Sequence, residues 1–383
     1  MDDKDKKISL RFDLSTPLAR VVSEKYLEFA FPFRRFQIAE VFRNETSKTG
    51  RGRYRSFFQG DFDQIFSGKV PPQANAEIVQ IIRDTMLDLK FKKEQFKINI
   101  FNRKIIEGLL NDLKINDEKQ RFKVLRSIDK FDRIDKNFID LLKKERIDPV
   151  SGDKISGANL SDEQASIIID FLKLKDLKNL KSNCNNDLQK EGIKELEEIL
   201  EILSYDGYSD QVCIDPSRIR GINYYDSFVV ETTINFKVKN KQNKSVELGS
   251  VASGGSYAKL CSRFKGGANF EGTGCSFGIS RLTYLILQLD QLEATQKLPV
   301  IICLMNKKYF SYANEIASIL RKKNINTEIY SDPNKNLGKQ LTYANKKGNP
   351  VACIVGSNEF KDNTVTLKNL LAKKGEDNQI TIP

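Results

Sequence analysis

The chain has 383 residues, of which 39% are hydrophobic, and this length is typical of roughly two or three domains with buried cores. A formal net charge of +12 and an isoelectric point near 9.2 favour a polyanionic partner such as nucleic acid, although a lysine-rich proteome without a charged ligand explains them equally well. The sequence contains no histidine, which excludes Ser-His-Asp triads, Cys-His pairs and a histidine general base.

Residues 8–102 combine strands, a basic loop and a helix. Strand signals are strongest at residues 36–42 and 56–66, and a loop rich in glycine and arginine, at residues 43–55, joins the two strands into a hairpin. Residues 74–92 place apolar side chains on one face of a helix, and residues 96–101 alternate like a strand.

Residues 103–205 change character, with sparse glycine and proline and apolar positions at helical spacing. They predict a helical insertion. After it, residues 228–234 predict a strand, residues 249–255 a flexible glycine-rich turn, and residues 278–289 a helix. Because strands lie on both sides of the insertion, we expect an antiparallel sheet that is completed after it.

The C-terminal region alternates strands and helices, which predicts a small α/β domain. Its strands are expected at residues 300–305, 327–330, 351–355 and 364–367, and its helices at residues 312–322 and 337–346. The predicted organisation is an α+β domain in two parts, 1–102 and 206–292, the insertion at 103–205, and the α/β domain at 298–383.

Cysteine usage and hydropathy indicate the compartment. The six cysteines include no C-x-x-C pair, and no apolar run approaches the ~20 residues of a membrane span. The N-terminus is polar and lacks the apolar centre of a signal peptide. We expect free thiols in a reducing compartment, no zinc site, no side-chain metal ligands, and a soluble cytoplasmic protein without a membrane partner.

The second strand of the hairpin carries an ordered row of functional groups. Alternate residues of a strand share one face, so this strand should present cations, an aromatic ring, an amide and carboxylates in turn. In order, these are Arg53, Arg55, Phe57, Gln59, Asp61 and Asp63. Arginines suit a polyphosphate, the ring suits a purine, and the carboxylates suit an ammonium or imidazole group. The alternative is a solvated basic loop on a structural sheet.

Two further stretches of sequence are weaker indications of a ligand site. Arg220 beside Gly221 could approach a ligand closely, with Tyr224 and Tyr225 as the walls of a small pocket. Arg281 at the start of an apolar helix could stack on a base. A surface arginine, core tyrosines and an ordinary turn before a helix explain the same residues.

The order of these stretches resembles that of the histidyl-tRNA synthetases along nearly the whole chain. The run LRFDLS at residues 10–15 is similar to the family's segment for the histidine amino group. FRNE at residues 42–45 and GRYRSF at residues 52–57 resemble class II motif 2. QGDFD at residues 59–63 continues the match, and its DFD ending is similar to the eukaryotic-type branch.

The resemblance continues to the C-terminus. RGINYY at residues 220–225 and SGGSY at residues 253–257 are similar to two family signatures, and GISRL at residues 278–282 resembles motif 3. Residues 299–370 resemble the anticodon-binding domain that the histidine, glycine, threonine and proline enzymes share. The implied fold is an α+β class II synthetase catalytic domain with an antiparallel sheet and a helical insertion, plus a small α/β anticodon-binding domain.

The resemblance also implies how ATP is bound. Arg43 would hold the α-phosphate together with the histidine carboxylate, and Phe57 and Arg281 would enclose the adenine. Glu45 and Arg53 would contact ATP, with Arg53 at the distal phosphates. Mg²⁺ would bridge the phosphates.

For histidine, the family's pattern implies contacts to the carboxylate, the ammonium group and the imidazole. Arg43 and Arg220 would be the catalytic residues, because both would stabilise the phosphate during attack. The residues implied in histidine binding are Asp13, Leu14, Ser15, Arg43, Gln59, Asp63, Arg220, Tyr224, Tyr225 and Tyr257. Of these, Asp13, Ser15 and Gln59 would hold the ammonium group. Asp63 and Tyr225 would read the imidazole, and Tyr224 and Tyr257 would shape its pocket.

The implied reaction has two steps, in which histidine and ATP form histidyl-adenylate and the histidyl group then passes to the histidine tRNA. The full-length form would be a homodimer. The sequence departs from the family pattern at Asn223, Ser256, Ala258 and Ser280, and compared with that pattern we expect it to lack the N-terminal motif 1 region. These departures leave two alternatives open for this chain: a synthetase-like protein that binds tRNA without aminoacylating it, and a structural subunit that lends an interface to a complete synthetase.

Overall fold

The computed structural model describes residues 9–44, 54–129, 131, 138–144, 146–147, 154–155, 157–219, 225–239, 245–246, 248–258, 260–264, 269–289, 298–332, 334–372 and 378–383. The chain forms two compact units, Met1–Gln291 and Leu292–Pro383. Each unit has its own buried apolar clusters. Among the described residues, no helix has both the length and the apolar character that a membrane span requires.

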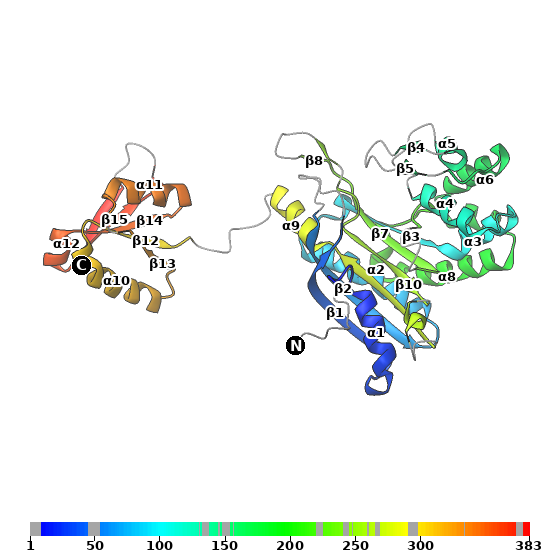
Figure 1. Cartoon of the computed structure of the whole chain (residues 1–383), viewed down its shortest axis with the longest axis horizontal. Helices are drawn as coiled ribbons and strands as arrows, with labels where there is room; N and C mark the ends of the chain where they lie inside the picture. Colours follow the sequence, from blue (N-terminus) through cyan, green and yellow to red (C-terminus); the bar gives the residue numbers. More distant parts are fainter. Residues whose placement is uncertain are drawn as a thin grey trace. The chain divides into compact units, whose positions relative to one another are not determined.

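The first unit is built on a seven-stranded sheet with the order β1-β2-β11-β10-β7-β3-β6 (Figure 1). Its strands are β1 (Phe33–Phe42), β2 (Ser56–Ser67), β3 (Phe96–Asn102), β6 (Val212–Ile214), β7 (Phe228–Ile234), β10 (Ala252–Tyr257) and β11 (Phe270–Phe277). Neighbouring strands are antiparallel, except that β6 runs parallel to β3. Strands from both sides of the helical region therefore complete one sheet, which confirms that prediction.

Helices cover the sheet and extend beyond β3. They are α1 (Ser15–Lys25), α2 (Pro72–Asp88), α3 (Arg103–Asp112), α4 (Glu118–Ile128), α5 (Phe138–Lys143), α6 (Asp162–Leu172), α7 (Leu177–Ser182), α8 (Asp187–Ser204) and α9 (Ile279–Gln288). Two short ribbons, β4 (Arg146–Ile147) with β5 (Lys154–Ile155) and β8 (Val238–Lys239) with β9 (Ser245–Val246), lie outside the main sheet.

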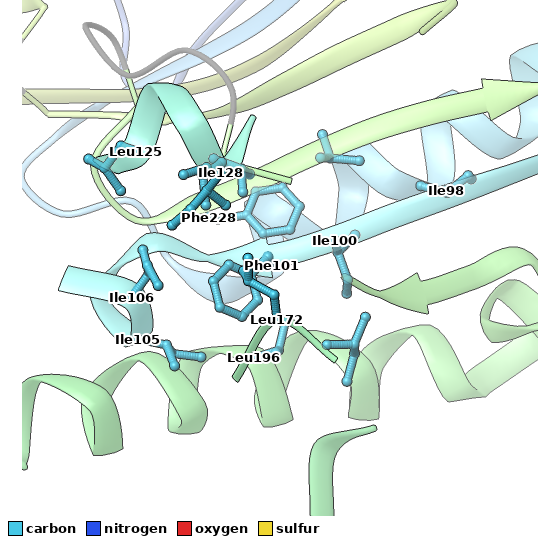
Figure 2. Packing of buried hydrophobic residues seen from close by; sticks show 14 of the residues in the cluster. Ile98, Ile100, Phe101, Ile105, Ile106, Leu125, Ile128, Leu172, Leu196 and Phe228 are labelled. Atoms are coloured by element: carbon cyan, nitrogen blue, oxygen red, sulfur yellow. The ribbon is translucent and has the colours of Figure 1, made fainter. Parts of the chain in front are cut away.

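Helix α8 joins the helical region to the sheet. Its apolar residues recur at helical spacing, and it begins with a capping box between Asn186 and Gln189. It packs against α3, α2 and β3. Figure 2 shows Leu196 of α8 beside Phe101 of β3 and Ile105 of α3, all fully buried. The predicted insertion at 103–205 thus begins and ends with helices that pack on the sheet, and its boundaries as a domain stay a prediction.

Several parts of the first unit differ from the sequence expectation. Helix α1 and strands β6 and β11 were not predicted. The flexible turn expected at residues 249–255 is wrong for its second half, since residues from Ala252 onward form the central strand β10. A Cβ added to Gly254 would overlap the Gly274 carbonyl of neighbouring β11. The glycines therefore permit close strand packing here, whereas the expectation took them as marks of a turn.

The second unit has a five-stranded sheet with the order β13-β12-β14-β15-β16. Its strands are β12 (Val300–Leu304), β13 (Thr327–Ile329), β14 (Val351–Val355), β15 (Val365–Asn369) and β16 (Gln379–Ile382), and its helices are α10 (Phe310–Lys322), α11 (Leu337–Lys347) and α12 (Ser357–Asp362). Strand β12 is parallel to both neighbours, and the β14-β15-β16 pairs are antiparallel.

Alternate residues of β12 enter two separate apolar clusters. Ile302 packs in the cluster that contains Ala313 of α10, and Ile301 packs in the cluster that contains Ala344 of α11. The two helices therefore cover opposite faces, as a side-chain period of two requires. This confirms the predicted α/β character, whereas α12 and β16 were not predicted.

Candidate active site on the sheet of the first unit

The β1–β2 hairpin aligns polar side chains in pairs. In its register, Arg35 lies opposite Asp63, and Gln37 lies opposite Asp61. Strand β2 lies between β1 and β11, so its side chains are flanked on each face of the sheet by side chains from both neighbouring strands. The polar row expected on this strand is buried from Gln59 to Asp63.

Arg43 lies directly after β1, between two aromatic rings. Its guanidinium carbon is 4.7 Å from the ring centre of Phe12 and 5.2 Å from that of Phe57. Nε donates to the Phe12 carbonyl at 3.2 Å, and Nη2 donates to Gln59 Oε1 at 3.0 Å. A guanidinium that lies over two aromatic rings and donates to an amide oxygen suits forked binding of a phosphate or carboxylate.

Gln59 is oriented by two neighbours. Its Nε2 donates to Asp61 Oδ1 at 2.8 Å and to Ser276 Oγ of β11 at 3.0 Å. Burial raises the pKa of Asp61, while its hydrogen bonds with Gln59 and Ser276 and the charge of Arg35 oppose that rise. The amide oxygen of Gln59 is thereby directed at Arg43.

Asp63 is the most enclosed acid of the row. Its Oδ2 forms an ion pair with Arg35 Nη2 at 2.7 Å, and its Oδ1 accepts from the Tyr257 hydroxyl at 2.8 Å. Burial raises the pKa of Asp63 to about 7, and Asp61 adds to the rise, whereas Arg35 and Tyr257 lower the pKa. This carboxyl can change its charge near neutral pH.

Glycines leave room for the acid and for two tyrosines. A Cβ on Gly274 would overlap Asp63 Oδ1, and a Cβ on Gly272 would overlap the Tyr257 ring. Gly255 lies against the ring of Tyr225, whose carbonyl accepts a hydrogen bond from the buried Arg103. Side chains at these glycines would displace the expected imidazole-reading residues.

The segment before α1 contacts the same row. Asp13 accepts from the Thr16 N–H at 2.8 Å and from the Thr16 hydroxyl at 3.1 Å, and thus caps the start of α1. Leu14 has a buried side chain, and its carbonyl accepts from Arg35. Ser15 is the first helical residue.

Arg281 lies in the first turn of α9, where its Nη1 donates to the Ser250 carbonyl. Its neighbour Ser280 accepts from the Phe58 N–H at 3.0 Å, which ties α9 to β2. Of the other expected site residues, Glu45, Arg53, Arg220 and Tyr224 lie outside the described part of the chain.

Three departures from the family pattern have clear local surroundings. Ser256 Oγ donates to Asn75 Oδ1 at 2.7 Å, and the Ala258 N–H donates to Asp226 Oδ2 at 2.8 Å. Tyr257, which lies between Ser256 and Ala258 in the sequence, is buried and donates a hydrogen bond to Asp63. Ser280 makes the contact to β2 described above, and Asn223 lies outside the described residues.

Arg35 and Gly274 belong to the site although the sequence patterns did not indicate them. The first strand was expected to begin at residue 36, which left Arg35 outside it. Extending that strand along the hairpin register would have placed Arg35 opposite Asp63. The need for glycine at position 274 comes from a neighbour far away in sequence, so no local signal indicates it.

Comparison with known proteins gives a consistent result for both units. The family model described as histidyl-tRNA synthetase matches residues 1–282, and the anticodon binding domain model matches residues 299–383. The histidine–tRNA ligase of Pelagibacter ubique is 55% identical over 384 aligned residues, which cover 100% of this chain and 81% of that protein. The histidine–tRNA ligase of Ruegeria pomeroyi is 35% identical, with 95% of this chain and 74% of that protein covered.

A solved structure agrees with these matches. The crystal structure of histidyl-tRNA synthetase from Nostoc has a TM-score of 0.68 and 26% sequence identity to this chain, and covers 98% of this chain and 83% of that one. These findings confirm the expected fold class, a class II catalytic domain with a separate anticodon-binding domain. The chain belongs to the histidyl-tRNA synthetase family.

Proposed function

We propose that this chain activates L-histidine with ATP to give histidyl-adenylate and diphosphate, and then transfers the histidyl group to the 3′ end of the histidine tRNA. The observation that carries the proposal is that Arg43 contacts the buried Gln59, whose amide contacts the buried Asp61, while the buried Asp63 on the same face of β2 is held by Arg35 and Tyr257. A cation, an amide and a paired acid match a substrate that has a carboxylate, an ammonium group and an imidazole. Family membership supports the same conclusion.

Arg43 would hold the histidine carboxylate and the ATP α-phosphate together. Its position between Phe12 and Phe57 restricts its motion, so less conformational entropy is lost when it binds. Phe57 and Arg281 would enclose the adenine, and Glu45 and Arg53 would contact ATP, with Arg53 at its distal phosphates.

Histidine would lie along the row with its ring at Asp63. Asp63 and Tyr225 would read the imidazole, and Tyr257 and Tyr224 would shape the pocket around it. The segment 13–15 and Gln59 would hold the ammonium group, with Leu14 acting through its backbone. This arrangement is supported by the contacts that join Leu14, Arg35 and Asp63.

The chemical step requires positioning and charge stabilisation, without a covalent intermediate on the protein. As the carboxylate attacks the α-phosphate, negative charge grows on the phosphate oxygens, and Arg43 and Arg220 would stabilise it. When bound, Mg²⁺ would neutralise charge on the ATP phosphates. Among the described residues, no group of three or more acidic, cysteine or histidine side chains is placed to hold a metal ion.

The wider setting is also part of the proposal. The helical region and the second unit would bind the tRNA, and the protein would act in the cytoplasm as a homodimer. We also propose that the chain is of the eukaryotic type within the family, on the basis of the DFD run at residues 61–63.

Histidine-dependent exchange between ATP and labelled diphosphate tests the first step. We expect exchange that requires histidine and falls by about 100-fold or more in Arg220→Ala and in Arg43→Ala, because each change removes a charge partner of the transition state. Arg34→Gln is the matched control, because Arg34 pairs with Glu77 at the surface and should leave exchange unchanged.

The opposite result has a definite meaning. A folded chain that binds tRNA but shows no histidine-dependent exchange would be a tRNA-binding relative without aminoacylation activity. Exchange that another amino acid supports better than histidine would contradict the assigned substrate.

A further inference from the structure

Arg35 joins three groups beside the buried row. Its Nη2 donates to Asp63 Oδ2 at 2.7 Å and to the Leu14 carbonyl at 3.1 Å, and its Nη1 donates to Gln37 Oε1 at 2.8 Å. The side chain of Arg35 is 12% exposed and that of Asp63 is 3% exposed. A single guanidinium thus connects β1, β2 and the segment before α1.

We propose that Arg35 is a positioning residue for histidine binding, which fixes the Asp63 carboxylate in one orientation and ties it to the backbone at Leu14. The inference rests on the proposed function, in which Asp63 reads the imidazole and segment 13–15 holds the ammonium group. Because Nη2 contacts both Asp63 and Leu14, it sets the separation between the two places where histidine is recognised.

The surroundings of Asp63 explain why a cation is needed. Its Oδ1 already accepts from Tyr257, and Gly274 packs against that oxygen. Each carboxylate oxygen keeps a further lone pair for a ligand. The charged and titratable groups that face Asp63 are Arg35 on β1, Asp61 on β2, Tyr257 on β10, Cys261 after β10 and Cys275 on β11. Arg35 is the cation in this set, so its loss leaves a buried acid that gains a proton more readily.

A purely structural role for Arg35 explains the contacts less well. The neighbouring Arg34 makes a forked pair with Glu77 at the surface, where the side chains are 54% and 31% exposed. The Arg35 pair is desolvated, and Arg35 Nε is buried without a hydrogen-bond partner among the described residues. Such a pair contributes little net stability compared with apolar packing, and its benefit is a defined geometry.

The test compares Arg35→Gln and Arg35→Lys with the surface control Arg34→Gln in histidine-dependent exchange. We expect Arg35→Gln to raise the KM for histidine by about tenfold or more. The KM for ATP should stay within about twofold of wild type, because Arg35 contacts Asp63 and the Leu14 carbonyl at the proposed histidine end. Protonation of Asp63 at low pH should weaken histidine binding and so raise the histidine KM. Without the Arg35 cation, Asp63 should gain its proton at a higher pH, so the histidine KM should begin to rise at a higher pH. Arg35→Lys keeps the charge and should restore the pH profile, but not the full affinity.

Several outcomes would overturn the positioning role. An unchanged histidine KM in a folded Arg35→Gln protein would do so, as would a parallel rise of both KM values. If Arg35→Gln does not fold, Arg35→Lys decides, and a wild-type histidine KM in that variant contradicts the role. Failure of the proposed function is seen separately, because the wild-type chain would then show no histidine-dependent exchange.

Discussion

Asp63 shows how the surroundings of one residue control its charge. The pKa of this carboxyl is raised from 3.8 to about 7, chiefly by burial and against the charge of Arg35. An acid with a raised pKa holds its proton in the folded state at pH values where the unfolded chain has lost it. The folded state then binds more protons, so this group's contribution to the free energy of unfolding falls as pH rises from about 4 to about 7.

Asp63→Asn should remove this pH dependence. The wild-type chain should lose on the order of 4 kcal/mol of stability, relative to the variant, between pH 4 and pH 7, because each pKa unit corresponds to about 1.36 kcal/mol. Thermal unfolding of both proteins across this range gives the measurement. The wild-type midpoint should fall relative to that of Asp63→Asn as pH rises. Parallel curves would show that Asp63 titrates near its ordinary pKa.

At the scale of elements, local patterns predicted the hairpin well. Strand β2 was expected at residues 56–66 and spans Ser56–Ser67, because aromatic and β-branched residues, which favour strands, recur along it. Tyr257 meets Asp63 across 194 residues of sequence, and that contact could be expected only from the family resemblance. Strand β10 was missed because glycine disfavours strands locally, whereas here its lack of a side chain lets three strands and the site residues approach closely.

Gly274→Ala should disrupt the site more than it disrupts the fold. The added Cβ would overlap Asp63 Oδ1 and the Phe62 carbonyl, so Asp63 must move, and overpacking should cost about 1–3 kcal/mol of stability. Histidine KM in the exchange assay should rise by about tenfold or more, since displacement of a binding group by ~1 Å is costly.

Gly338→Ala is the matched control for this change. A Cβ there meets Asn336 at 3.7 Å, which is ordinary contact, and the residue lies in helix α11. Alanine favours helix, so this variant should keep or slightly raise the thermal midpoint. An unaltered histidine KM in Gly274→Ala would show that the close packing seen at Asp63 does not govern binding.

At the scale of the whole molecule, the net charge of +12 should affect the two proposed steps differently. Activation involves small ligands enclosed by the row, whereas transfer requires a large polyanion to approach a basic surface. Polyanion binding releases counterions and weakens with salt, and enclosed contacts are screened much less. The two units have separate apolar clusters, so each can fold around its own core.

Salt should therefore affect tRNA and histidine differently. Between 50 and 200 mM salt, we expect the KM for tRNA in aminoacylation to rise by about tenfold or more, which corresponds to two or more phosphate contacts. The KM for histidine in exchange without tRNA should change by less than about twofold. Equal sensitivity of both constants would contradict a mainly electrostatic contribution to tRNA binding.

The absence of histidine from the sequence makes the imidazole of a bound histidine, beside the buried Asp63, easy to observe. These 383 residues include no histidine, so every imidazole signal in a nuclear magnetic resonance spectrum of a tag-free complex would come from the ligand. Ring nitrogens labelled with ¹⁵N have shifts that distinguish the two neutral tautomers from the imidazolium ion. The spectrum would therefore report directly which nitrogen carries the proton next to Asp63, without background from the protein.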